Sequence, residues 1–204
     1  MDLYFALMKS FILLFLFIFS FFYSCKKTDS RLDQIHQIQS NQTLTEEESL
    51  YQMARIIFSD TLKNFKLEKN SRGANDVSIE FGGNRAYTFY SESDYKEKIQ
   101  FDVVRYILLY SQVTENKNIG AIRISLVKPY FVKEPDAKKE ITEEFEVFRV
   151  NISMEDIKKI SGWNNPKIWN DSRNINSSNM TELFNQVRLK WKIELNELSR
   201  IELK

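Results

Sequence analysis

The feature that most constrains this chain of 204 residues is an apolar segment near its amino terminus that ends at the only cysteine. Lys9 precedes the segment, Phe11–Tyr23 is its apolar part, and Cys25 follows shortly after it. As a helix these residues rise about 20 Å, whereas a membrane-spanning helix needs about 20 apolar residues. The length predicts the apolar region of a secretory signal peptide, starting from Met8 or from Met1. The alternatives are a signal anchor that stays in the membrane, a buried helix of a soluble protein, and a signal that is cleaved elsewhere and leaves the cysteine as a free thiol.

The residues just before the cysteine indicate how the signal is processed. Phe22 and Tyr23 are bulky, whereas an ordinary cleavage site needs small residues at the positions that the peptidase reads. Together with Ser24 and Cys25 they resemble the lipobox of bacterial lipoproteins, although both aromatic residues are larger than is usual in that family. The resemblance covers the start of the chain only. It implies cleavage before Cys25, a diacylglycerol on its thiol and a place in the bacterial cell envelope. Lys26, which is not an aspartate, slightly favours the outer membrane.

These observations divide the chain into three parts. Residues 1–24 are predicted to be the lipoprotein signal peptide, residues 25–44 a lipidated cysteine with a polar tether that has room for a helical turn or two, and residues 45–204 a single globular domain. An extended tether reaches about 3.5 Å per residue, so it would hold the domain several tens of Å from the membrane. His36 lies in this tether, and we expect its side chain to be solvated.

Composition excludes several classes of function. The chain has 29 basic and 28 acidic residues without a strong positive cluster, so no nucleic-acid partner is predicted. There is no thiol after Cys25 and only one histidine, so the fold must rest on its apolar core, without disulfides or a cysteine- or histidine-rich metal site. Gly82-Gly83 matches neither a P-loop nor a dinucleotide fingerprint, and it predicts a hairpin turn. No cofactor is predicted.

Hydrophobic periodicity predicts an α+β fold. We expect a mainly antiparallel sheet of about four strands, arranged as two hairpins, with helices packed against one of its faces. Four helices are expected. The first begins at Thr45 and runs past Phe65, and the second extends from about 91 to 115. The third is a short helix after Ser153, and the fourth runs from about Asn179 to the end. The expected strands are 77–81 with 86–90 and 119–132 with 140–152.

The Asn-rich stretch Trp163–Ser178 is the candidate binding surface. Tryptophan rings and asparagine amides suit sugars or extended peptides, which makes Trp163 and Trp169 the candidate binding residues. The alternative is that both rings anchor a long loop to the core.

An acidic run in the second hairpin offers carboxylates to a cation, but its spacing scatters them over both faces of a strand. We therefore expect a solvated strand edge instead of a metal site. The run consists of Glu143, Glu144 and Glu146.

The sequence favours a membrane-anchored, non-catalytic binding module whose partners are the membrane, through the lipid on Cys25, and an envelope or host protein or a glycan. A structural or assembly factor of the envelope is the alternative. A hydrolase is less favoured, because a Ser-His-Asp site would need His36 and a cysteine nucleophile is lost on lipidation. An open concave aromatic cleft would favour ligand binding, whereas a flat apolar patch would favour a protein partner.

Overall fold

The computed structural model describes residues 30–83, 92–132, 141–171 and 177–198. The chain divides into two units, Met1–Ser30 and Arg31–Lys204, and the description below concerns the second. Cys25 and the predicted strand 86–90 lie outside the described residues. The elements are α2 (Ser30–Ser40), α3 (Glu46–Phe58), η1 (Ser59–Thr61), β1 (Leu62–Lys69), β2 (Asn75–Phe81), α4 (Glu92–Val113), β3 (Ile119–Val132), β4 (Ile141–Ser153), α5 (Met154–Lys158), α6 (Ile168–Asp171), α7 (Ser178–Lys190) and β5 (Lys192–Asn196).

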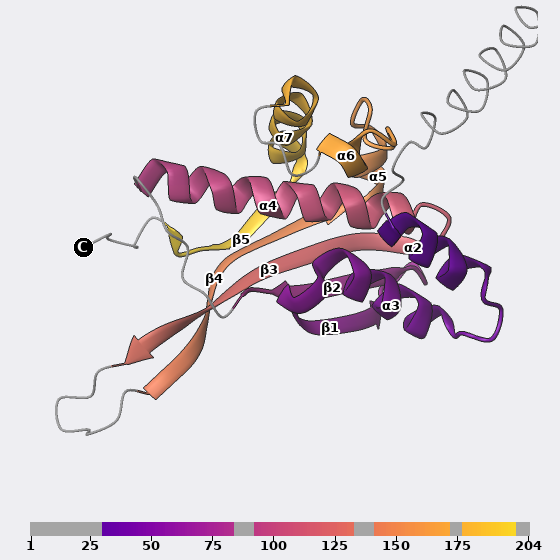
Figure 1. Cartoon of the computed structure of the whole chain (residues 1–204), viewed down its shortest axis with the longest axis horizontal. Coiled ribbons are helices and arrows are strands. Elements are labelled where there is room, and N and C mark those ends of the chain that lie inside the picture. Colours follow the sequence, from indigo (N-terminus) through magenta and orange to yellow (C-terminus); the bar gives the residue numbers. More distant parts are fainter. Residues whose placement is uncertain (1–29, 84–91, 133–140, 172–176, 199–204) are drawn as a thin grey trace, which may run out of the picture. The chain divides into compact units, whose positions relative to one another are not determined.

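The strands form one sheet in the order β1-β2-β3-β4-β5 (Figure 1). β2 and β3 are parallel, and the other neighbouring strands are antiparallel. A parallel pair needs a crossover connection, which α4 supplies between β2 and β3. The predicted α+β class is confirmed, with a sheet that has five strands in the described residues and is mixed.

One face of the sheet forms the core with the helices. Three rings from different elements meet there: Phe58 of α3 lies 4.3 Å from Tyr106 of α4, and Phe81 of β2 lies 4.9 Å from the same ring. Because Phe58 and Tyr106 both contact Phe81, α3 and α4 cover the same face. The buried side chains on this face of β2, β3 and β4 are Val77, Ile79, Phe81, Ile122, Ile124, Leu126, Phe148, Val150 and Ile152.

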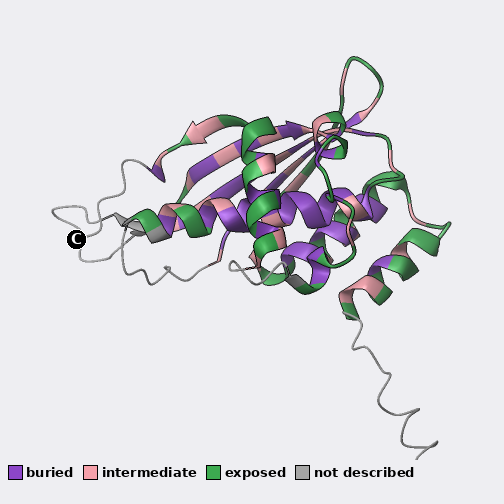
Figure 2. Ribbon diagram, turned by 90° about the horizontal axis from the view of Figure 1, so that it is seen from above, coloured by how far each residue is buried: buried purple, intermediate pink, exposed green. Residues whose placement is uncertain are grey.

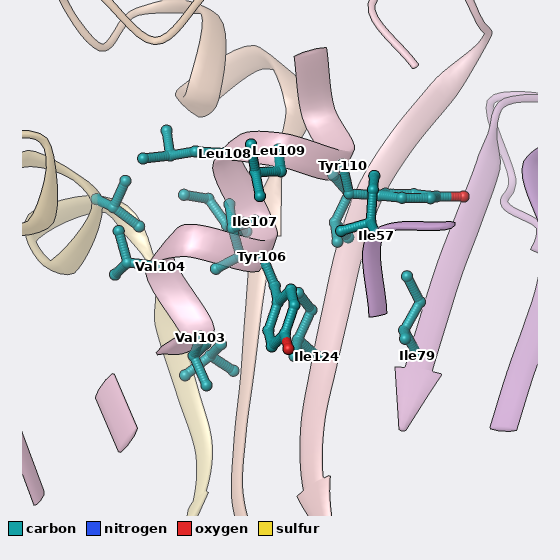
Figure 3. Packing of buried hydrophobic residues seen from close by; sticks show 14 of the residues in the cluster. Ile57, Ile79, Val103, Val104, Tyr106, Ile107, Leu108, Leu109, Tyr110 and Ile124 are labelled. Carbon is teal, nitrogen blue, oxygen red and sulfur yellow. The ribbon is translucent and has the colours of Figure 1, made fainter. Parts of the chain in front are cut away.

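α4 is the central helix, as its wide apolar stripe predicts. Val103, Val104, Leu108 and Tyr110 point in different directions, and none is exposed (Figures 2 and 3). Burial raises the pKa of the Tyr110 hydroxyl, which donates to the Leu50 carbonyl of α3 at 3.3 Å. The hairpin of β3 and β4 is also confirmed, as is the short helix α5, whose first turn is capped by Ser153.

The helix that begins after Thr45, α3, is shorter than predicted. It ends at Phe58, and Leu62 and Phe65 belong to the strand β1. The spacing of Phe58, Leu62 and Phe65 fits a helix, but Phe65 and Leu67 also alternate with exposed residues, as in a strand. Antiparallel pairing with β2 favours the strand over the helix for these residues. Since β1 and β3 occupy both edges of β2, the predicted pairing of 77–81 with 86–90 is wrong.

The last predicted helix is also too long. α7 ends at Lys190, Trp191 is extended with a ψ of 154°, and β5 follows it. Leu195 fits both a helical and an alternating pattern, so periodicity leaves this segment ambiguous. Residues 192–196 form a strand because they pair with Phe148–Asn151 of β4, whose backbone groups would otherwise lack partners on that side.

Residues 30–40 form a helix and not part of a tether. Ile35 of α2 is 1% exposed and belongs to the core, with Leu32 and Ile38 packed against it. The Gln39 side chain donates to the carbonyl of Val113 at the end of α4, at 2.8 Å. The folded unit therefore starts before the predicted boundary at residue 45. In the parts of the chain described above, no helix has both the length and the apolar character needed to span a membrane.

Candidate functional site

The two candidate binding tryptophans lie inside the fold. Trp163 is 6% exposed and Trp169 is 5% exposed, and both belong to the hydrophobic core. Buried rings offer no face to a sugar or a peptide, so the structure favours the alternative in which both residues anchor the loop. Residues 172–176, the Asn-rich middle of that loop, lie outside the described residues.

Gln112 of α4 holds this loop in place. Its amide nitrogen donates to the carbonyls of Trp163 at 2.7 Å and Asn165 at 3.3 Å, while its amide oxygen accepts from the Trp169 indole nitrogen at 2.9 Å. The guanidinium of Arg31 in α2 lies 5.3 Å from the centre of the Trp169 ring. The loop therefore ties α4 to α2, and its tryptophans serve the fold.

The described residues form a groove between α2 and α3, two helices that lie next to each other along the chain (Figure 1). This open groove has a volume of about 810 Å³, within the range of sites that bind small ligands. Amide, guanidinium, aromatic and aliphatic groups line it together. The lining residues are Arg31, Gln34, Gln37, Ile38, Asn41, Leu44, Glu48, Tyr51, Gln52, Arg55, Ile56 and Ser59.

The turn between α2 and α3 shapes one end of this groove. The side-chain oxygen of Asn41 accepts from the backbone nitrogen of Thr43 at 3.0 Å and from its hydroxyl at 2.7 Å. Thr45 and Glu48 then form the predicted capping box at the start of α3. The Thr45 backbone N–H and hydroxyl both donate to the Glu48 carboxylate and lower its pKa. Glu48 is thus engaged in holding the end of the helix.

Tyr51 gives the groove an exposed aromatic ring. It is 41% exposed, with its ring 5.6 Å from Phe65 of β1 and 6.0 Å from the Arg55 guanidinium. Rings of this kind hold a guanidinium by cation–π attraction and offer a flat apolar face to a ligand. Arg31, placed against Trp169, is the second guanidinium of the groove. The groove therefore combines two positive charges with amide donors and acceptors.

A second group of ionisable residues lies beneath α4, near the start of β1. Lys128 of β3 is 8% exposed and Asp102 of α4 is 7% exposed. Burial lowers the pKa of Lys128, with the positive charge of Lys63 adding to the effect and the negative charge of Asp102 opposing it. Asp102 forms ion pairs with Arg105 at 3.4 Å and Lys98 at 3.5 Å. This arrangement is an ion-pair network.

A third group lies on the face of the sheet opposite the core. Glu194 of β5 forms ion pairs with Arg123 at 2.9 Å and Arg149 at 3.4 Å. Burial raises the pKa of Glu194, but hydrogen bonds from Asn151 and Arg123 and the charges of both arginines outweigh it, so the pKa is lowered. These contacts link β3, β4 and β5 across the sheet.

The remaining sequence candidates lie apart from the groove. Glu144 is paired with Lys63, and Glu146 is paired with Arg149 at 3.3 Å. His36 is exposed on α2 and does not line the groove. Among the described side chains, no three His, Cys, Asp or Glu residues come together in a way that could hold a metal ion.

The sequence contained one signal for the groove. Leu32, Ile35 and Ile38 recur every three residues between a polar start and the cap at Thr45, which is the pattern of a short amphipathic helix before a second helix. Which polar residues of α2 and α3 line the groove together depends on the relative placement of the two helices, which the sequence pattern does not give. Comparisons with family models, with curated proteins and with solved structures find no match for this chain.

Proposed function

We propose that this chain is a lipid-anchored protein of a bacterial cell envelope that binds a ligand in the groove between α2 and α3 without transforming it. The observation that carries the binding role is the groove itself, where the ring of Tyr51 and the amides of Gln37 and Gln52 line one concave surface. A concave surface with an aromatic ring favours a ligand over a flat protein partner. The lipid anchor rests on the lipobox-like residues that end at Cys25.

The groove and the ion-pair network around Asp102 occupy different parts of the fold. General acid–base catalysis needs a titratable group within hydrogen-bonding reach of the bound reactant. Lys128 and Asp102 are nearly buried beneath α4 and are absent from the groove lining, while Glu48 is engaged by Thr45. This separation supports binding over hydrolysis.

The anchor is tested by expressing the full chain in a bacterial host with labelled palmitate and separating membrane from soluble protein. We expect the label and membrane retention in the wild type, and neither in Cys25→Ala. An unlabelled wild-type chain that remains uncut in the membrane would identify a signal anchor and overturn the lipid-anchor part of the proposal.

The binding role is tested by nuclear magnetic resonance titration of the purified, detergent-solubilised lipoprotein. The probes are an N-acetylglucosamine tetramer, an alanine tetrapeptide and short-chain phosphatidylglycerol. We expect at least one probe to shift amide signals of α2 and α3 and to leave those of β3 and β4 in place. Tyr51→Ala should weaken that binding about tenfold, because stacking on one aromatic ring contributes about 1.4 kcal/mol. Shifts confined to other elements would contradict the assignment of the groove.

A further inference from the structure

The position of α2 in the chain limits how far the groove can lie from the membrane, provided that the proposed lipid anchor on Cys25 is present. α2 begins at Ser30, five positions after Cys25, and Arg31 already lines the groove. At about 3.5 Å per residue, the Arg31 backbone can lie no more than about 21 Å from that of Cys25. This reach is shorter than the hydrocarbon core of a bilayer, which is about 30 Å thick.

The rest of the groove lies close to that first residue. α2 has eleven residues, which rise about 16 Å as a helix. The helix is fixed to the domain by the buried Ile35 and by the hydrogen bond from Gln39 to Val113, so it cannot serve as additional tether. A lipid on Cys25 would therefore keep the Arg31 end of the groove within about 21 Å of the lipidated residue and the far end of α2 within about 37 Å of it.

The charge of the groove matches what a bacterial membrane surface presents. Arg31 and Arg55 bring two guanidinium groups, each positioned by an aromatic ring, at 5.3 Å from Trp169 and 6.0 Å from Tyr51. Guanidinium binds phosphate oxygens through paired donors, and it is favoured wherever phosphate is recognised. Among the described lining residues the one carboxylate is that of Glu48, which accepts the Thr45 hydrogen bonds.

The remaining lining suits the rest of a lipid headgroup. Gln34, Gln37 and Gln52 offer amide donors and acceptors for hydroxyl groups, while Ile38 and Ile56 offer apolar surface beside them. We propose that the ligand of this groove is the phosphate-bearing headgroup of a membrane lipid, which the short connection between Cys25 and α2 brings within reach. The proposal rests on the anchor proposed above and specifies the ligand of the same groove.

Site-specific photocrosslinking in intact cells tests this assignment. A benzophenone amino acid replaces Gln37, which lines the groove, or His36, its exposed neighbour on α2, which does not. The two positions are neighbours on α2, so the comparison separates binding in the groove from general proximity to the membrane. Cells are grown with radioactive phosphate, illuminated and extracted with organic solvent. Phosphate labels membrane phospholipids but not the acyl chains on Cys25.

We expect the Gln37 variant to retain at least fivefold more covalent phosphate label than the His36 variant. Adding Arg55→Gln to the Gln37 variant should reduce that label severalfold. The mass of the crosslinked peptide distinguishes the sources, because a phosphorylated lipid adduct supports the proposal and a soluble phosphate ester, a glycan or a peptide overturns it. Equal or absent label at both positions also overturns it.

Palmitate labelling of the same samples separates the two proposals. A chain that carries palmitate on Cys25 but no phosphate label at Gln37 contradicts the lipid-headgroup assignment alone. A chain without palmitate contradicts the anchor, and the headgroup assignment falls with it, because no lipid on Cys25 then holds the groove near the membrane. Palmitate label with membrane retention shows that the Gln37 and His36 variants are exported and lipidated, and cooperative urea unfolding of both purified variants shows that they are folded.

Discussion

Two regions of this protein differ from what their composition suggests. The Trp163–Trp169 stretch looks like a ligand-binding loop, yet both rings are buried and its polar groups bond to Gln112. Residues 30–40 look like a polar tether, yet they form a helix that lines one side of the groove. The comparison teaches that the residue types in a segment do not reveal which of its side chains remain exposed. Burial of a few apolar side chains decides that.

Replacing Trp169 by alanine should have the largest effect on stability. The ring is 5% exposed and its indole nitrogen donates to Gln112; removing a buried tryptophan destabilises a protein by about 3 to 5 kcal/mol. Urea unfolding measures the change. The control is Leu189→Ala, because Leu189 is 84% exposed and its loss should matter little. A change below about 1 kcal/mol for Trp169→Ala would restore the loop as a candidate binding surface.

Replacing Ile35 by alanine tests whether α2 is a structural helix. Ile35 is 1% exposed, so the substitution should lower the free energy of unfolding by about 2 to 4 kcal/mol. Proteolysis in the turn at Asn41–Thr45 should become faster as α2 detaches. The neighbouring substitution His36→Ala, on the exposed side of the same helix, should change stability by less than about 0.5 kcal/mol. If the two variants behave alike, residues 30–40 act as a tether after all.

Gln112→Ala should have an intermediate effect. The substitution removes the hydrogen bonds of Gln112 to the Trp169 indole nitrogen and to the carbonyls of Trp163 and Asn165. Unsatisfied buried polar groups cost about 1 to 3 kcal/mol, which thermal unfolding can measure. Gln52→Ala is the matched control, since its amide lines the groove and we expect it to affect ligand binding more than stability. If Gln52→Ala lowered stability and Gln112→Ala lowered ligand binding, the structural role would belong to the groove and the binding role to the tryptophan loop.

The pH dependence of the α3 capping box should give the smallest effect. The pKa of Glu48 is lowered in the folded protein by hydrogen bonds from Thr45. Its stabilisation is therefore fully present above the ordinary glutamate pKa and is lost as the pH falls through the lowered value. Urea unfolding of wild type and Glu48→Gln should differ at pH 7 and converge at acid pH. A difference that grows on acidification would show that the carboxylate does not stabilise the cap in its charged form.

The centre of the sheet could be predicted from the sequence, whereas its edges could not. β3 and β4 alternate over many residues, and Ile124 and Val150 face the core as that alternation requires. β1 and β5 are edge strands with a weaker apolar pattern, and both continue a helical spacing from the helix before them. An edge strand buries fewer side chains, so its sequence specifies it less strongly and the neighbouring strand selects its conformation.

The groove illustrates the same limit for function. The capping box at Thr45 and Glu48 could be predicted, because it depends on residues three positions apart. That Gln37 and Gln52 line the same groove, and that Arg31 lies over Trp169, depends on where the rest of the fold holds α2. No local pattern encodes such contacts.

The sequence by itself determined the α+β class, the central helix α4, the hairpin of β3 and β4, and the capped starts of α3 and α5. Each follows from side chains a few positions apart in the chain, where periodicity and capping act. Only the tertiary structure decided that β1 and β5 are strands, that residues 30–40 belong to the fold and that Trp163 and Trp169 are buried. Those outcomes depend on contacts between distant segments, whose apolar burial outweighs weak local preferences.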